Sequence, residues 1–185
     1  MTSTSTTRNS RRLPTGSLPP GTCWLGLDPG SRKAGYAVLE MGSDGRPRYR
    51  ECGLLTSAHD QLPLRLLEIG DALREVILEY RPVEAAVEDV FTANNSRTAL
   101  ILGQARGMAL YVLASAGVAV FSYTPGHVKK AICGQGRASK LQVRMNMMHL
   151  LRLHAEPEED AADALALAYC HAMHSRPLQR VGGVP

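Results

Sequence analysis

The chain has 185 residues, of which 44% are hydrophobic and 21% charged, with a formal net charge of +4. This length and composition are typical of one compact domain with its own core. No apolar stretch is long enough to cross a bilayer and no secretory signal is recognisable, so we expect a soluble, cytoplasmic protein. Its four cysteines are widely separated, which argues against a redox dithiol and favours reduced, buried thiols.

The positive charge lies mostly at the two ends of the chain. Residues 1–21 carry three arginines and no acid, and residues 176–185 carry two arginines and no acid. The first segment is rich in Ser, Thr, Arg and Pro, with too little apolar surface to offset the entropy of ordering it. We therefore expect a disordered N-terminal tail, a folded domain at residues 22–175 and a flexible C-terminal tail.

Within the domain, residues 90–155 contain no acid at all, and we call this segment the basic stretch. Eight cations without a balancing anion are uncommon on solvated helix faces, and contact with phosphates is the commoner reason for such a segment. These cations are Arg97, Arg106, Lys129, Lys130, Arg137, Lys140, Arg144 and Arg152.

The spacing of apolar residues predicts a strand meander followed by alternating helices and strands. Expected strands are at residues 22–28, 36–41, 48–55, 83–91 and 117–123, and expected helices at 62–80, 96–116 and between 125 and 175, broken at "GQGRA" and near Pro157. This order indicates an α/β fold with a mixed five-stranded sheet flanked by helices.

Carboxylates occur at three unusual places in this layout. Asp28 ends the first predicted strand, Glu88 lies inside the apolar fourth strand, and Asp160 and Asp163 share one face of the last helix. Taken singly, Asp28 could be an ordinary turn residue, and Asp160 could be explained by the preference for acids at a helix N-terminus. Together they favour a divalent metal site, because a buried carboxylate needs a partner. Oxygen ligands without His or Cys suit Mg²⁺ or Mn²⁺ better than zinc.

Two other ligand sites are not indicated. Gly30 and Gly35 have the spacing of a phosphate-binding loop, but Tyr36 follows where such a loop requires lysine. His171 and His174 are three residues apart on the last helix, but with no third ligand in view we expect them on the surface.

Acids for metal ions beside a basic stretch for phosphates indicate phosphodiester hydrolysis with two metals roughly 3.5–4 Å apart. Three segments, "LGLDPGSRKAGYAV", "AVEDVFTANNSRTALILGQARG" and "DAADALALA", resemble the RuvC family of Holliday-junction resolvases in order and spacing. The resemblance covers about residues 22–175. The first segment is similar in other ribonuclease-H-like proteins and in actin-like ATPases, so the second carries the identification.

The resemblance implies a ribonuclease-H-like fold, a homodimer, and paired, symmetric metal-dependent nicks at four-way DNA junctions in recombination and repair. It also implies a branch-migration helicase complex as a partner. It assigns Asp28, Glu88, Asp160 and Asp163 as ligands of two Mg²⁺ or Mn²⁺ ions, with Lys140 as a further catalytic residue. Together with the basic stretch it predicts DNA contacts by Phe91, Arg97, Lys129, Lys130, Arg137, Lys140 and Arg144.

There are three alternatives to this interpretation, of which the first and third stay open. A related nuclease acting on RNA precursors would share the first segment but is not expected to carry "LGQARG". An actin-like ATPase or sugar kinase needs a second lobe, for which 185 residues leave no room. A non-catalytic junction-binding protein would keep the basic stretch and could lack the acids.

Overall fold

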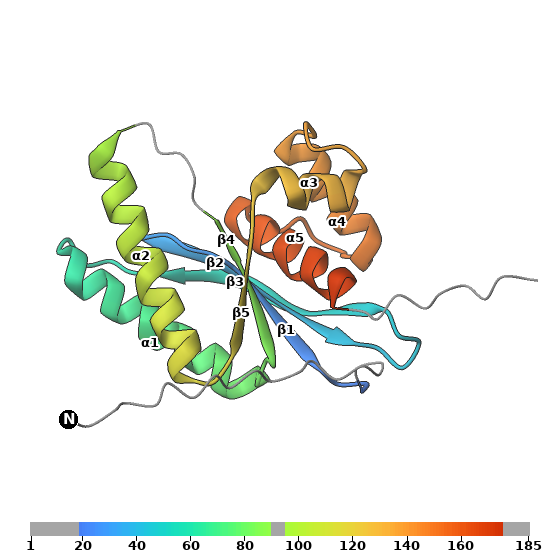
Figure 1. Cartoon of the computed structure of the whole chain (residues 1–185), viewed down its shortest axis with the longest axis horizontal. Helices are drawn as coiled ribbons and strands as arrows, with labels where there is room; N and C mark the ends of the chain where they lie inside the picture. The colour runs from blue at the N-terminus through green and yellow to red at the C-terminus, as the bar shows by residue number, and fades with distance from the viewer. Residues whose placement is uncertain (1–18, 90–94, 176–185) are drawn as a thin grey trace, which may run out of the picture.

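A five-stranded sheet runs through the centre of the computed structural model, which describes residues 19–89 and 95–175 (Figure 1). The strand order is β3-β2-β1-β4-β5; the pairs β1–β2 and β2–β3 are antiparallel, and β1–β4 and β4–β5 are parallel. The strands are β1 (Cys23–Asp28), β2 (Lys33–Met41), β3 (Pro47–Thr56), β4 (Glu84–Glu88) and β5 (Ala119–Tyr123). The helices are α1 (Leu62–Tyr80), α2 (Ser96–Ser115), α3 (Pro125–Cys133), α4 (Lys140–Leu151) and α5 (Glu159–His174).

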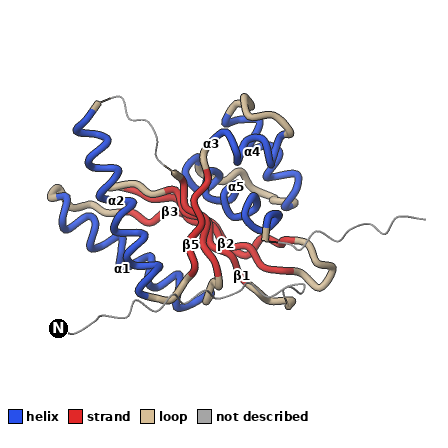
Figure 2. The backbone as a smooth tube through the Cα atoms, in the orientation of Figure 1, coloured by secondary structure: helices blue, strands red, loops and turns tan. Residues whose placement is uncertain are grey.

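The helices cover the sheet in two groups, one on each face (Figure 2). Strand alternation sends Leu25 and Leu27 of β1 into a core cluster with α1 and α2. Trp24 points to the opposite face and packs in a second cluster with α3, α4 and α5. The central strands β1, β2 and β4 are therefore buried on both faces, which accounts for the nearly continuous apolar run of β1.

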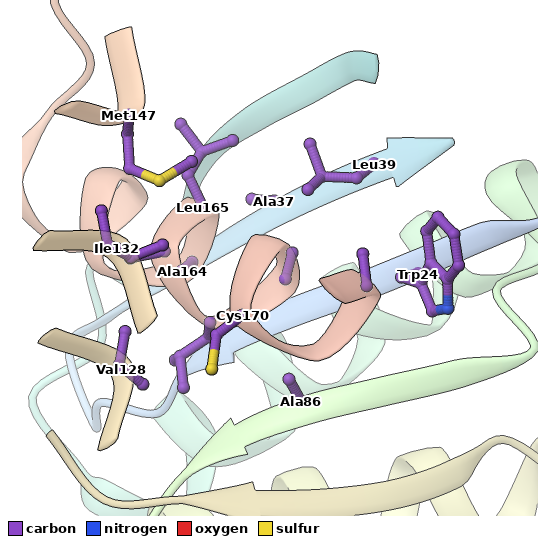
Figure 3. Packing of buried hydrophobic residues seen from close by; sticks show 14 of the residues in the cluster. Trp24, Ala37, Leu39, Ala86, Val128, Ile132, Met147, Ala164, Leu165 and Cys170 are labelled. Atoms are coloured by element: carbon purple, nitrogen blue, oxygen red, sulfur yellow. The ribbon is translucent and has the colours of Figure 1, made fainter. Parts of the chain in front are cut away.

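The backbone of helix α5 lies directly against the sheet at two glycines. A Cβ atom on Gly26 would lie 2.0 Å from the carbonyl oxygen of Ala164, and one on Gly35 would lie 2.0 Å from that of Asp160. The helix contributes alanines at this contact, and Figure 3 labels Ala164 and Leu165 of α5 in one cluster with the strand residues Ala37 and Ala86. Only glycine on the strands permits so close an approach of the helix backbone.

The predicted elements are confirmed with small shifts at their ends. The helix expected at residues 62–80 has those bounds, and the second strand begins at Lys33 because its hairpin with β3 continues to the pair Lys33–Thr56. The fourth strand ends at Glu88, earlier than expected, and residues 90 and 91 lie outside the described part. The predicted tails also lie outside it, apart from residues 19–21.

Two further expectations concern membrane-spanning helices and the burial of the cysteines. No helix among them has both the length and the apolar character needed to span a bilayer. All four cysteines are free thiols; Cys170 is buried as expected, whereas Cys23, Cys52 and Cys133 are only half-buried.

The contact of α5 with the sheet can be tested with Gly26→Ala. We expect a loss of about 3 kcal/mol or more in the free energy of unfolding, because the added methyl group meets backbone atoms that cannot move aside. For a domain of this size, that loss lowers the thermal midpoint by roughly 6–12 °C.

Gly103→Ala is the matched control, since Gly103 lies within α2 and an added Cβ meets nothing within 4 Å. That change should leave stability unaltered or raise it by up to about 1 kcal/mol. Equal midpoints for the two variants would contradict the close packing of α5.

Candidate active site

Three carboxylates and two lysines line a cavity of about 250 Å³ at the edge of the sheet where β1 and β4 end. Asp28 is the last residue of β1 and Glu88 the last of β4, and the parallel pairing of Leu27 with Val87 brings these strand ends together. Asp163 reaches the cavity from α5, Lys129 from α3 and Lys140 from α4. The remaining lining residues are Pro125, Val128, Val143, Ala166 and Leu167.

The carboxylates lie close enough to perturb one another. Burial, reinforced by the charges of Glu88, Asp163 and Asp160, raises the pKa of Asp28 to about 8. Burial and the charge of Asp163 also raise the pKa of Glu88, although a hydrogen bond with Asp28 and the charges of the two lysines oppose that rise. Both shifts have the direction expected for like charges crowded in a poorly solvated site.

Lys140 bridges two acidic residues of α5, Glu159 and Asp163. Its Nζ donates hydrogen bonds of 2.8 Å to Oδ2 of Asp163 and of 2.8 Å to Oε1 of Glu159. Burial alone would lower the pKa of Lys140, but these hydrogen bonds outweigh burial and raise it. Ser139 and Gln142 form a reciprocal capping box that fixes the start of α4, and with it the position of Lys140.

Asp160 is the one predicted metal ligand that does not line the cavity. Its Oδ2 lies 2.7 Å from Nζ of Lys33 on β2, and the lysine side chain is 54% exposed. Its charge still contributes to the raised pKa of Asp28. Asp160 is thus near the cavity but is paired with a lysine that the sequence analysis did not single out.

Arg106, a member of the basic stretch, holds the end of β4. Its Nε donates to the carbonyl oxygen of Glu88 at 3.1 Å, and its Nη2 donates to Oγ of Ser122 at 2.8 Å. Nη2 also lies 3.3 Å from Oδ1 of Asp89. Asp89 is absent from the cavity lining, and Arg106 positions Glu88 through its backbone carbonyl.

The other predicted DNA-contacting residues differ in their solvent exposure and in whether they form an ion pair. Arg144 is 27% exposed, and its Nη2 lies 2.8 Å from Oε1 of Glu156. Arg97, Lys130 and Arg137 are exposed, and none of them has an ion pair within residues 19–89 and 95–175. Phe91 lies outside the described residues.

The expectation that His171 lies on the surface is wrong. His171 is 1% exposed, with Nε2 2.9 Å from Oε2 of Glu84 and Nδ1 2.8 Å from the Tyr123 hydroxyl. Both ring nitrogens therefore have partners, which makes burial tolerable, and the hydrogen bond from His171 holds the pKa of Glu84 below its ordinary value. His174 is exposed, as expected.

Three further residues interact with the predicted site residues but were not predicted from the sequence to do so: Lys33, Glu159 and Arg106. The sequence held a signal for Glu159, because it precedes Asp163 by four residues and so shares its helix face. No comparable spacing links Lys33 to Asp160 or Arg106 to Glu88.

The strand order and the carboxylates gathered at the sheet edge define a ribonuclease-H-like protein. The family model for crossover junction endodeoxyribonuclease RuvC matches residues 24–171, and the chain belongs to this family.

Individual relatives agree with this assignment. The RuvC of Halorhodospira halophila is 49% identical over 161 residues, covering 83% of this chain and 92% of the relative. That of Hahella chejuensis is 45% identical over 160 residues, covering 86% of this chain and 92% of the relative.

Solved structures show the same likeness. Thermus thermophilus RuvC in complex with a Holliday junction substrate superposes with a TM-score of 0.78 at 31% identity, covering 84% of this chain and 95% of the other. The yeast mitochondrial Holliday junction resolvase Ydc2 matches with a TM-score of 0.59 at 15% identity, covering 84% of this chain and 80% of the other, and shares the fold.

Proposed function

We propose that this chain is a structure-selective endonuclease that resolves four-way DNA junctions by paired nicks. The observation that carries the proposal is the cavity in which Asp28, Glu88 and Asp163 meet Lys129 and Lys140 at the end of two parallel strands. Membership of the RuvC family and the likeness to a relative bound to a Holliday junction substrate support it.

The donor atoms of the cavity fit a divalent cation. Its lining offers carboxylate oxygens and no His or Cys, which favours Mg²⁺ or Mn²⁺. Burial and the neighbouring carboxylates raise the pKa values of Asp28 and Glu88, and a bound cation would offset both causes. We assign Asp28, Glu88 and Asp163 as ligands of two ions, with Asp160 joining them when it separates from Lys33. Two bound ions supply activation of water and stabilisation of the leaving oxygen.

The protein's own cations complete the chemistry. Lys140 sits beside Asp163 and Glu159, so its ammonium can move from these acids to a scissile phosphate and stabilise the charge of the transition state. Lys129 faces the same cavity from α3. Exposed Arg97, Lys130 and Arg137 are suited to backbone phosphates further from the reacting bond.

Phe91 completes the proposed DNA contacts. It follows Glu88 by three residues and precedes the polar run "TANNSR". We assign it to stacking on an unpaired base at the centre of the junction, an interaction worth roughly 1–3 kcal/mol. Such stacking would hold the opened junction in place for cleavage.

The assembly is part of the proposal. Two symmetric nicks need two active sites, and a homodimer with two-fold symmetry provides them on a junction of matching symmetry. A branch-migration helicase complex is the expected partner, and the cytoplasm the expected location, because the family's substrate is a DNA recombination intermediate.

Asp28→Asn and Glu88→Gln test the catalytic assignment. Each removes a charged ligand while keeping the shape of the side chain, so cleavage of a synthetic four-way junction with Mg²⁺ should fall by more than about 100-fold. Junction affinity measured in EDTA should change little, since basic groups carry it.

Asp71→Asn is the control, because Asp71 is an exposed residue of α1 paired with Arg74. Wild-type cleavage rates in Asp28→Asn and Glu88→Gln would disprove the site. Faster cleavage of an RNA hairpin than of the junction by the wild-type protein would favour the nuclease for RNA precursors.

Lys140→Ala and Arg137→Ala test the division of labour among the cations. In single-turnover assays at saturating protein, Lys140→Ala should lower the cleavage rate by roughly 10–100-fold with a smaller effect on affinity. Arg137→Ala should mainly weaken binding and reduce the dependence of log K on log salt by about one. Arg137 serves better here than Arg144, whose pairing with Glu156 mixes DNA binding with stability. Equal effects of both changes on rate and affinity would reject the distinction.

A further inference from the structure

A second group of possible metal ligands lies away from the acids, where α3 packs against the C-terminal part of α5. His127 belongs to the first turn of α3, and Cys170 and His174 are one turn apart on α5. One ligand atom from each of these three residues lies within 4.8 Å of the others. None of the three lines the acid cavity.

The two imidazoles are oriented as metal ligands would be. Nδ1 of His174 lies 2.7 Å from the carbonyl oxygen of Cys170, which can only accept, so this nitrogen carries the proton. Its Nε2 therefore presents a lone pair, and it lies 3.1 Å from Nε2 of His127. Two nitrogens bound to one tetrahedral zinc ion at about 2.0–2.1 Å are separated by about 3.3 Å. A backbone carbonyl that fixes the ring of a ligating histidine is the usual support of such sites.

The Cys170 thiol is the buried member of this cluster. Cys170 is fully buried in the α5 core cluster beside Val128 and Ile132 of α3, where Figure 3 labels all three. His127 and His174 are exposed, so an ion can enter from solvent between the two rings. Its fourth position would face water. Two imidazoles and a thiolate select zinc-like ions, in contrast to the all-oxygen cavity.

We propose that His127, Cys170 and His174 form a second metal site, for a zinc-type transition-metal ion, that fastens α3 to α5. On binding, the Cys170 thiol would release its proton to solvent and the thiolate would coordinate the ion. Burial raises the pKa of this thiol to about 11 in the metal-free protein, so the ion's charge is needed to stabilise the thiolate. The fastening would also fix Lys129, which lies two residues after His127 and lines the acid cavity.

The alternative is a pair of surface histidines joined by one hydrogen bond. In that arrangement His127 would donate Nε2–H to Nε2 of His174, and the rings would pack with Tyr123, whose ring centre lies 5.5 Å and 5.9 Å from theirs. In that arrangement the Cys170 thiol, whose Sγ lies 3.8 Å from Nδ1 of His174, would keep its proton and bind no ion, and this difference decides the experiment.

The test is a titration of the chelator-treated full chain with Co²⁺, the spectroscopic substitute for Zn²⁺, in the presence of excess Mg²⁺ to occupy the acid cavity. We expect one equivalent of Co²⁺ to give intense visible bands of a four-coordinate ion and a near-ultraviolet thiolate charge-transfer band, both removed by Zn²⁺. His127→Ala and Cys170→Ala should each abolish the charge-transfer band. His149→Ala and Cys133→Ala, which change a histidine and a cysteine outside the cluster, should retain it.

Thermal unfolding gives a second readout. Zn²⁺ at a free concentration of about 100 times its Kd should raise the midpoint of the wild-type protein by roughly 5–10 °C. With the same excess of Mg²⁺ present, it should not raise that of His127→Ala, whose altered side chain is exposed.

Co²⁺ binding without a thiolate band, or a band that persists in His127→Ala, would overturn the proposal and leave the hydrogen-bonded pair. A Cys170→Ala variant that fails to fold does not prevent this decision, because His127→Ala alone distinguishes the two arrangements. None of these readouts depends on junction cleavage, so the second site and the proposed nuclease function can fail separately.

Discussion

The contact between the α5 backbone and the sheet is the constraint on which both the core and the site depend. Gly26 and Gly35 leave no side chain between β1, β2 and the carbonyl oxygens of Ala164 and Asp160. Because the helix lies this close, its first turns reach the strand end that carries Asp28. The same contact that buries the alanines of α5 therefore brings carboxylates from distant segments into one cavity.

The site is a concentration of negative charge that the fold offsets with a few cations. Burial and neighbouring acids raise the pKa of Asp28 to about 8, which is unfavourable for its charged form. Lys33 and Lys140 pair with Asp160 and Asp163, and Arg106 fixes the strand end through the Glu88 carbonyl. In the proposed reaction, Lys140 would leave Asp163 for the phosphate once bound cations neutralised the carboxylates. Under the proposed function, these ion pairs describe the metal-free state of the site.

Much of this could be predicted from the sequence, because periodicity reports burial and a charge in an apolar element is conspicuous. Those signals located all five strands and placed Asp28, Glu88 and Asp163 in one site. They could not reveal the pairing of Lys33 with Asp160 or the burial of His171 on Glu84, a residue 87 positions away, since such partners meet only in the folded chain. The closeness of His127 and Cys170 to His174 was missed for the same reason.

The central claim is that the cavity at the ends of β1 and β4 binds the divalent ions that cleave DNA. Anomalous scattering from crystals grown with Mn²⁺ tests it most directly. The account predicts Mn²⁺ peaks at about 2.1 Å from carboxylate oxygens of Asp28, Glu88 and Asp163, with Lys140 displaced from Asp163. Ordered Mn²⁺ elsewhere on the protein, with no peak between these three carboxylates, would contradict it.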